Sequence, residues 1–241
     1  MKKICITGTS KTGKTTLAIS LAHTLVEKNP GRSCIIVLCK NIPSEYPIIF
    51  PFTNPENFKP LSSIINSELN PGNLGKYIIT KKADPDIGYI GYTESDLKNK
   101  YPELPVSICS SLASNLEIMT DYVIYDCDDN IFRSPLTLEG IKRSDIHIKV
   151  MKPDIKSIVY ENMTGEYLKE KCKAGKIITI LNNTYESRHC VKEGFEYNYE
   201  IPFKENILSE FHKGNITGYD MSSDSKTKGY IEQIAKVISD G

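Results

Sequence analysis

A short segment near the start of the chain has the residue types and the spacing of a phosphate-binding loop. Residues 8–15 read G-T-S-K-T-G-K-T, which fits the pattern G-x-x-x-x-G-K-[ST]. In this pattern the glycines let backbone N–H groups point at an anion, and the helix that follows adds the positive end of its dipole. The alternative is an ordinary glycine turn before a helix. We predict that phosphate is bound by a run of consecutive residues: Gly8, Thr9, Ser10, Lys11, Thr12, Gly13, Lys14, Thr15 and Thr16.

Three residues at the end of this loop have separate expected roles. Lys14 should reach the β- and γ-phosphates of a nucleoside triphosphate. The hydroxyl of Thr15 should hold Mg²⁺. Thr16 either bonds the α-phosphate region or simply continues the helix.

A site for Mg²⁺ and a triphosphate also needs a carboxylate at the end of a neighbouring buried strand. Residues 121–126 read D-Y-V-I-Y-D, so apolar and aromatic residues lead into Asp126. We predict that Asp126 holds the metal ion directly or through water; the alternative is that it caps a turn. Asp128 and Asp129 follow at once, and carboxylates this close repel one another unless a cation or backbone donors offset them. The predicted catalytic residues are Lys14, Asp126, Asp128 and Asp129.

The identity of the base can be argued from a motif that is missing. Guanine-specific switches read the base with Asn-Lys-x-Asp, whose carboxylate accepts from two guanine N–H groups, whereas residues 182–185 read N-N-T-Y. Tyrosine cannot make that double acceptance. Adenine is therefore favoured, with Asn182 as the candidate for its exocyclic amine and a ring nitrogen. The alternative that Asn182 only turns the chain stays open. The predicted cofactors are ATP and Mg²⁺.

These residues need a scaffold that brings them together, and the pattern of the chain indicates one. Short β-branched runs alternate with longer stretches of helical period, which is typical of a mostly parallel sheet with helices on both faces. The expected fold class is an α/β three-layer sandwich. The predicted strands are Lys3–Thr7, Cys34–Leu38, Ile87–Gly91, Asp121–Asp126, Asp145–Met151 and Lys176–Leu181. The predicted helices are Thr15–Glu27, Ser110–Met119, Ile155–Lys171, Glu205–His212 and Lys226–Ser239.

Two stretches lack a regular period. Residues 41–75 are rich in proline and asparagine and are predicted to form a long irregular excursion after the second strand. Residues 185–200 form a second candidate loop. Because no repeat or linker divides the chain, we expect residues 1–241 to form one nucleotide-binding domain. In the last predicted helix, isoleucines at helical spacing favour packing on the sheet over a membrane-surface anchor: Ile231, Ile234 and Ile238.

Composition narrows the class of protein. Thirty Lys and Arg balance thirty Asp and Glu, so the formal net charge is zero. This argues against a general polyanion binder, although a local basic patch stays open. No long apolar run or signal-peptide pattern is present, so we expect a cytoplasmic location.

The spacing of the cysteines and histidines matches no recognisable metal-binding or disulfide motif. None of the seven cysteines forms a C-x-x-C pair, which predicts neither a disulfide framework nor a zinc or iron–sulfur site. The four histidines also have no mutual spacing that indicates a metal site. The cysteines are Cys5, Cys34, Cys39, Cys109, Cys127, Cys172 and Cys190, and the histidines are His23, His147, His189 and His212.

The order of these segments resembles the MinD/ParA family of positioning ATPases over nearly the whole chain. The resemblance rests on the phosphate loop, the long excursion, DYVIYD, LEGIKRSDIHIKVMKPDIKSI, KIITILNN and EIPFKENI. Within the family the sequence is most similar to the divergent pilus-localisation branch, which is TadZ/CpaE-like. The resemblance implies a homodimer that forms on ATP binding, dissociates on hydrolysis and is read by a partner or surface. It also implies that Asn182, Pro202 and Phe203 flank adenine, and that Pro153 and Asp154 begin a loop near the dimer face.

The chain departs from the family pattern at two places. Family members usually carry a lysine after the first loop glycine, to reach the partner's phosphates; here that position is Thr9, and Lys11 occupies a position that is usually glycine. The strand 34–38 normally ends in Asp-x-Asp, but here it continues Cys39-Lys40-Asn41. Since in-line attack needs a group that orients water and a group that offsets charge, we expect slow or partner-dependent hydrolysis. Asp128 or Asp129 could supply the missing carboxylate.

Two alternatives and several partners stay open. One alternative is a nucleotide-binding scaffold that never hydrolyses ATP. The other is a small-molecule enzyme similar to dethiobiotin synthetase. This enzyme is disfavoured because the chain has only four arginines and shows no cluster of Arg and Lys for a small acid. A protein partner of an assembly or positioning system is expected. DNA binding is possible but not favoured, and peripheral membrane contact is also possible. The lysines that could form a DNA-binding patch are Lys169, Lys171, Lys173 and Lys176.

Overall fold

The computed structural model describes residues 1–40, 44–51, 53–98, 103–183, 196–202, 205 and 225–240. Several predictions fall outside these residues: the position of Phe203, nearly all of the predicted helix 205–212, and most of the predicted loop 185–200.

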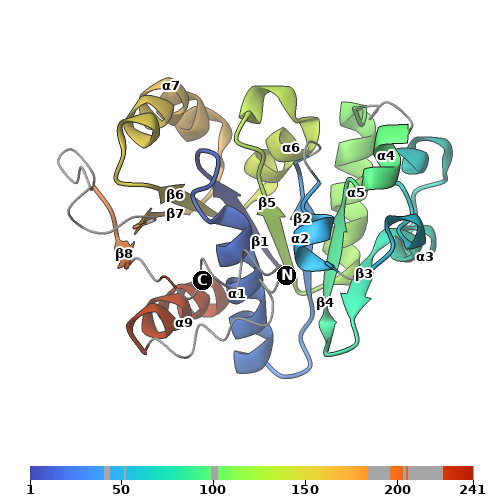
Figure 1. Ribbon diagram of the computed structural model, residues 1–241, viewed down its shortest axis with the longest axis horizontal. Helices are drawn as coiled ribbons and strands as arrows, with labels where there is room; N and C mark the ends of the chain where they lie inside the picture. Colours follow the sequence, from blue (N-terminus) through green and yellow to red (C-terminus); the bar gives the residue numbers. More distant parts are fainter. Residues whose placement is uncertain are drawn as a thin grey trace.

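One eight-stranded sheet forms the centre of the structure, in the order β3-β4-β2-β5-β1-β6-β7-β8 (Figure 1). All neighbouring strands are parallel except β3 and β4, which are antiparallel. The predicted α/β fold class is therefore confirmed. The strands are β1 (Lys2–Thr7), β2 (Cys34–Leu38), β3 (Ile79–Lys81), β4 (Asp84–Gly91), β5 (Tyr122–Asp126), β6 (Ile146–Met151), β7 (Lys176–Asn182) and β8 (Tyr199–Ile201).

Helices cover both faces of this sheet (Figure 1). The longer helices are α1 (Lys14–Lys28), α5 (Val106–Met119), α6 (Pro135–Arg143), α7 (Ile155–Lys171) and α9 (Ser225–Asp240). The shorter ones are α2 (Tyr46–Ile49), α3 (Pro71–Leu74) and α4 (Glu94–Lys98), with 3-10 turns η1 (Pro55–Asn57), η2 (Leu61–Asn66), η3 (Gly75–Tyr77) and η4 (Ile131–Arg133). In the described part of the chain, no helix has the length and apolar character needed to span a membrane.

The core is divided into two layers by the alternation of side chains along the strands. In β1, Ile4 and Ile6 face α1 and α9, while Cys5 faces the layer that contains α5, α6 and the end of α7. Both faces of the central strands are therefore buried, which explains their nearly continuous apolar character. The predicted packing of the C-terminal isoleucines is confirmed, because all three are buried against α1 and the sheet.

All six predicted strands are present, and two edge strands were missed. Strands β3 and β8 have only three residues each, too few for a visible alternation. The end of the predicted loop 185–200 belongs to β8, so the prediction was wrong there.

Helix α6 was also missed by the sequence analysis. It begins with a polar cap, since the Ser134 side chain accepts a hydrogen bond from the Thr137 N–H at 3.2 Å and Pro135 occupies the first helical position. Gly140 lets the helix approach β5, because a Cβ there would lie 2.6 Å from the Tyr125 ring. The Ser-Pro pair was the available sequence signal.

The predicted excursion contains only short helical turns, yet it is tightly packed. Tyr46, Phe50 and Phe58 form an aromatic cluster that contacts Tyr89 of β4. The buried Asp96 carboxylate also accepts hydrogen bonds from three backbone N–H groups, those of Leu61, Ser62 and Thr93. These contacts attach the excursion to the sheet edge.

Candidate functional site

The predicted phosphate loop lies at the carboxyl end of β1, in the middle of the parallel sheet. Strand β1 ends at Thr7 and α1 begins at Lys14, so the loop connects a buried strand to a helix start, as the motif requires. On β5, Asp126 pairs with Ile6 of β1 on one side and with Leu38 of β2 on the other. The ends of β1, β2 and β5 therefore bring the loop and the predicted metal-binding carboxylate together.

The loop backbone requires glycine at two of its positions. Gly8 has φ 152° and Gly13 has φ 90°. A Cβ on Gly8 would lie 2.1 Å from the Val150 carbonyl oxygen, and one on Gly13 would lie 2.6 Å from Nδ2 of Asn182. The third left-handed position is Lys11, with φ 59°, where a side chain is strained. Lys11 therefore has a left-handed backbone conformation, which glycine adopts without strain.

Lys14 is held against the loop itself. Its Nζ donates hydrogen bonds to the carbonyl oxygens of Gly8 and Thr9, each at 3.0 Å. Burial lowers the pKa of Lys14, while the negative charges of Asp126 and Asp129 oppose that shift. The Lys14 ammonium thus lies inside the loop. There, a charged phosphate oxygen would accept its hydrogen bonds in place of the neutral carbonyl oxygens.

Thr15 and Asp126 meet as the magnesium prediction requires. The Thr15 hydroxyl donates to Oδ2 of Asp126 at 2.6 Å. The other carboxylate oxygen, Oδ1, is buried and has no hydrogen-bond partner among the described residues. Burial raises the pKa of Asp126 to about 6, although Lys14 and the Thr15 hydroxyl act in the opposite direction. An unpaired buried carboxylate oxygen beside a hydroxyl fits a hard cation that prefers oxygen ligands.

Asp128 and Asp129 differ in their surroundings. The Asp128 carboxylate accepts the N–H of Asn130 at 3.0 Å, and its own N–H donates to the Thr137 hydroxyl at 2.9 Å. Burial and the neighbouring acid raise the pKa of Asp128. Burial also acts upward on Asp129, but the hydrogen bond from Asp128 and the charge of Lys14 bring the pKa of Asp129 below its usual value. Asp128 therefore holds the turn, while the surroundings of Asp129 favour its ionised form.

Lys40 was missed as a site residue. It follows β2, and its Nζ lies 3.4 Å from Oε1 of Glu45. Its charge lowers the pKa of Asp126, Asp128 and Asp129, which places a cation at the same end of the sheet. The available sequence signal was a lysine at the point where carboxylates were expected.

Of the predicted adenine residues, Asn182 contacts the loop. Asn182 ends β7, and its Nδ2 donates to the Thr12 carbonyl oxygen at 2.7 Å. Ile201 of β8 pairs with Asn182, so Pro202 follows at the same edge. Pro153 is buried and Asp154 caps α7 through the Ser157 N–H at 2.9 Å, so these two residues form the start of that helix.

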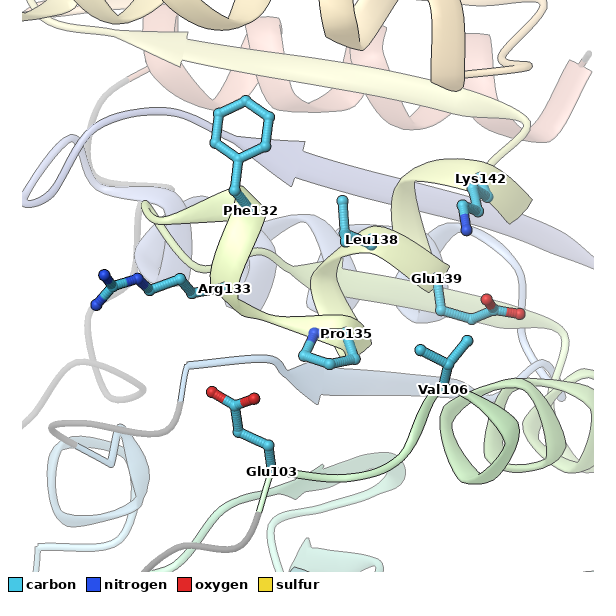
Figure 2. A pocket seen from close by; sticks show the side chains of 8 residues that line it. All are labelled: Glu103, Val106, Phe132, Arg133, Pro135, Leu138, Glu139 and Lys142. Atoms are coloured by element: carbon cyan, nitrogen blue, oxygen red, sulfur yellow. The ribbon is translucent and has the colours of Figure 1, made fainter.

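A cavity of about 380 Å³ lies elsewhere, between the start of α5 and the segment η4–α6 (Figure 2). It is lined by Glu103, Val106, Phe132, Arg133, Pro135, Leu138, Glu139 and Lys142, none of which is a predicted site residue.

Together, the strand-loop-helix segment, the loop lysine and the hydroxyl–carboxylate pair define the P-loop NTPase class of fold. Comparison with solved structures narrows the fold to that of the ParA and MinD ATPases. A ParA family ATPase from Chlorobium tepidum TLS is similar with TM-score 0.77 and 17% identity, over 98% of this chain and 99% of that one.

Two further similar structures carry nucleotides. The septum site-determining protein MinD from Pyrococcus horikoshii OT3, complexed with Mg-ADP, has TM-score 0.72 and 17% identity, over 99% of this chain and 96% of that one. A plasmid partition protein from Borrelia burgdorferi B31, bound to AMPPNP, has TM-score 0.72 and 16% identity, over 98% of this chain and 99% of that one. No family model matches the sequence. No curated protein matches it either.

Proposed function

We propose that the protein is an ATP-binding switch of the MinD/ParA type, whose nucleotide state controls a homodimer that positions or regulates a protein assembly. The observation that carries this proposal is the pairing of Thr15 with Asp126 beside Lys14, since a site for Mg²⁺ and a triphosphate needs these groups together. The shared fold with ParA and MinD ATPases supports the same function. We further propose that residues 1–241 act as one nucleotide-binding domain.

Phosphate binding follows from the loop geometry. Lys14 would exchange the Gly8 and Thr9 carbonyl oxygens for β- and γ-phosphate oxygens. Backbone N–H groups of the loop and the start of α1 would bind the remaining phosphate oxygens. Thr15 and Asp126 would hold Mg²⁺, which would neutralise the negative charge that develops on the phosphates.

Hydrolysis is proposed to be slow or dependent on a partner. Asp128 is engaged in its own turn, so Asp129 is the better candidate to orient an attacking water. Thr9 offers no charge at the position where the family pattern has a lysine. A scaffold that binds ATP without hydrolysing it is the second candidate function, and it is favoured by Lys40, a cation where water-positioning carboxylates were expected.

Dimer formation is proposed to involve Lys11. Its side chain is exposed, and its left-handed backbone costs about 1–2 kcal/mol relative to glycine. Backbone strain of this kind clusters at functional sites. We propose that Lys11 reaches the phosphates across the dimer, by a path different from that of a lysine at position 9.

The base and the partner belong to the same proposal. Asn182 contacts the loop and Pro202 follows the strand beside it, which supports the proposal that they flank adenine, while Phe203 lies outside the described residues. A protein partner is favoured over DNA because the net charge is zero. The candidate DNA-binding lysines lie around the end of α7, where Lys171 already pairs with Glu170. The TadZ/CpaE branch and the metabolic enzyme remain predictions.

Nucleotide binding can be tested by thermal unfolding with and without ATP and Mg²⁺. We expect ATP with Mg²⁺ to raise the Tm of the wild type, by an amount equivalent to about 2.7 kcal/mol when ATP is present at a hundred times its Kd. Lys14→Ala should abolish the shift, because it removes the charge inside the loop. Lys28→Ala, at the far end of the same helix, is the matched control and should keep the shift. A full shift in Lys14→Ala would contradict the proposed site.

A further inference from the structure

A second cluster of chemically reactive side chains lies on the opposite face of β1 from α1. Cys5 is on β1, His147 is directly opposite on β6, and Cys172 follows the last residue of α7. One sulfur or nitrogen atom from each residue lies within 4.8 Å of the others. No local spacing joins them, because Cys5 and His147 lie 142 positions apart in the sequence. Spacing along the chain therefore did not predict that these three side chains lie together.

The imidazole of His147 is oriented as a ligand. Its Nε2 lies 2.7 Å from the Thr7 hydroxyl, while its Nδ1 is buried and has no hydrogen-bond partner among the described residues. The residue is fully buried. If Nε2 carries the hydrogen and donates to Thr7, Nδ1 keeps a lone pair that is available to a metal ion. A second partner that fixes the ring in this way is a regular feature of metal-binding histidines.

The two thiols complement the imidazole. Cys5 is fully buried, and burial raises its pKa. The hydrogen bond from Cys5 holds the pKa of Cys172 well below its usual value, and His147 acts in the same direction against the effect of burial. Because the thiolate is the form that binds metal, both thiols would release their protons to the solvent on binding.

The spacing suits a small thiophilic cation. With Zn–S about 2.3 Å and Zn–N about 2.0–2.1 Å, neighbouring ligands of a tetrahedral ion lie about 3.5–3.8 Å apart. This is within the 4.8 Å span of the cluster, so only small side-chain movements are needed. Cys172 is partly exposed, which gives the ion access and leaves a side open for a fourth ligand such as water.

We propose that Cys5, His147 and Cys172 form a binding site for a thiophilic divalent cation of the zinc class, separate from the magnesium site. Bound there, the ion would join β1, β6 and the end of α7, and it would fix the strand that leads into the phosphate loop. Thr7, the second-sphere partner of His147, directly precedes Gly8.

The test uses the full chain, reduced and treated with a chelator, then titrated with Co²⁺ as a spectroscopic probe. We expect one equivalent to bind, with thiolate-to-cobalt charge-transfer absorption in the near ultraviolet and displacement by Zn²⁺. The oxygen ligands Thr15 and Asp126 cannot give a thiolate band, so the signal separates the two sites. Cys172→Ser should lose charge-transfer intensity and bind Co²⁺ at least tenfold more weakly, and His147→Gln should also bind more weakly.

Cys109→Ser is the matched control. Cys109 is a buried free cysteine outside the cluster, and its substitution should leave the cobalt spectrum unchanged. Because Cys172 is partly exposed, its serine variant should fold, which the Tm of the metal-free protein checks. The proposal is overturned if the reduced wild type binds no Co²⁺ in a one-to-one ratio, or if Cys172→Ser keeps the full band. The proposal is also overturned if the protein is isolated with a Cys5–Cys172 disulfide and binds no metal once that disulfide has been reduced.

Discussion

At the scale of single residues, the site combines groups from segments that are far apart in the sequence. Lys14 and Thr15 belong to one continuous motif, whereas Asp126 is more than a hundred positions away and meets Thr15 at 2.6 Å. The motif could be predicted because its spacing is local. Asp126 could be predicted because a phosphate loop requires a strand-end carboxylate.

Other site residues could not be predicted from the sequence alone. Lys40 joins the site only because β2 lies beside β5 in the sheet, and no local spacing encodes that order. Cys5 and His147 meet for the same reason, since β1 pairs with β6. The separate roles of Asp128 and Asp129 depend on a turn closed by Asn130, which the run of acids does not reveal.

Lys40 supplies a prediction at this scale. Lys40→Ala should weaken binding of ATP with Mg²⁺ by about 1 kcal/mol, or roughly fivefold. The substitution removes a partly buried positive charge beside Asp126, Asp128 and Asp129, so the negative phosphates would be attracted less strongly. Isothermal titration calorimetry of the variant measures this change. Lys59→Ala, which removes a lysine from the face of the Tyr77 ring, is the control and should bind ATP normally. Unchanged affinity in Lys40→Ala would remove Lys40 from the site.

At the scale of elements, the long buried strands were predictable and the short or tightly packed elements were not. The six central strands show continuous apolar runs, because both of their faces are covered. Strands β3 and β8 are too short to show a pattern. Helix α6 is short, and its position depends on a close approach of Gly140 to Tyr125 that only the packed structure shows.

Gly140 gives the prediction at this scale. In Gly140→Ala the new Cβ would lie 2.6 Å from the Tyr125 ring, so α6 or the ring must move. We expect the free energy of unfolding to fall by about 1–3 kcal/mol, measured by urea denaturation.

The matched control is Gly229→Ala in α9, where a Cβ would meet no atom within 4 Å. That change should raise the free energy of unfolding by about 0.5–1 kcal/mol, since alanine has the higher helix propensity. Equal effects of the two substitutions would contradict the close packing of α6 on β5.

At the scale of the whole molecule, the proposed site for a highly charged ligand lies in a chain with no net charge. The thirty positive and thirty negative residues cancel, yet the loop N–H groups, Lys14 and Lys40 gather at one end of the sheet. In the proposed site, local placement of these groups would attract phosphate without a surplus of positive charge. The same neutrality favours a protein partner over DNA, because general DNA affinity depends on surplus cations.

The central claim is that ATP controls association of two chains through this site. The most direct measurement is the molar mass of the purified protein by light scattering after gel filtration, in Mg²⁺ with ATP and, separately, with ADP. We predict the mass of two chains with ATP and of one chain with ADP, and a loss of the ATP-bound dimer in Lys11→Asn, a substitution that tolerates the left-handed backbone. A protein that binds both nucleotides and keeps the same mass in each would contradict the switch.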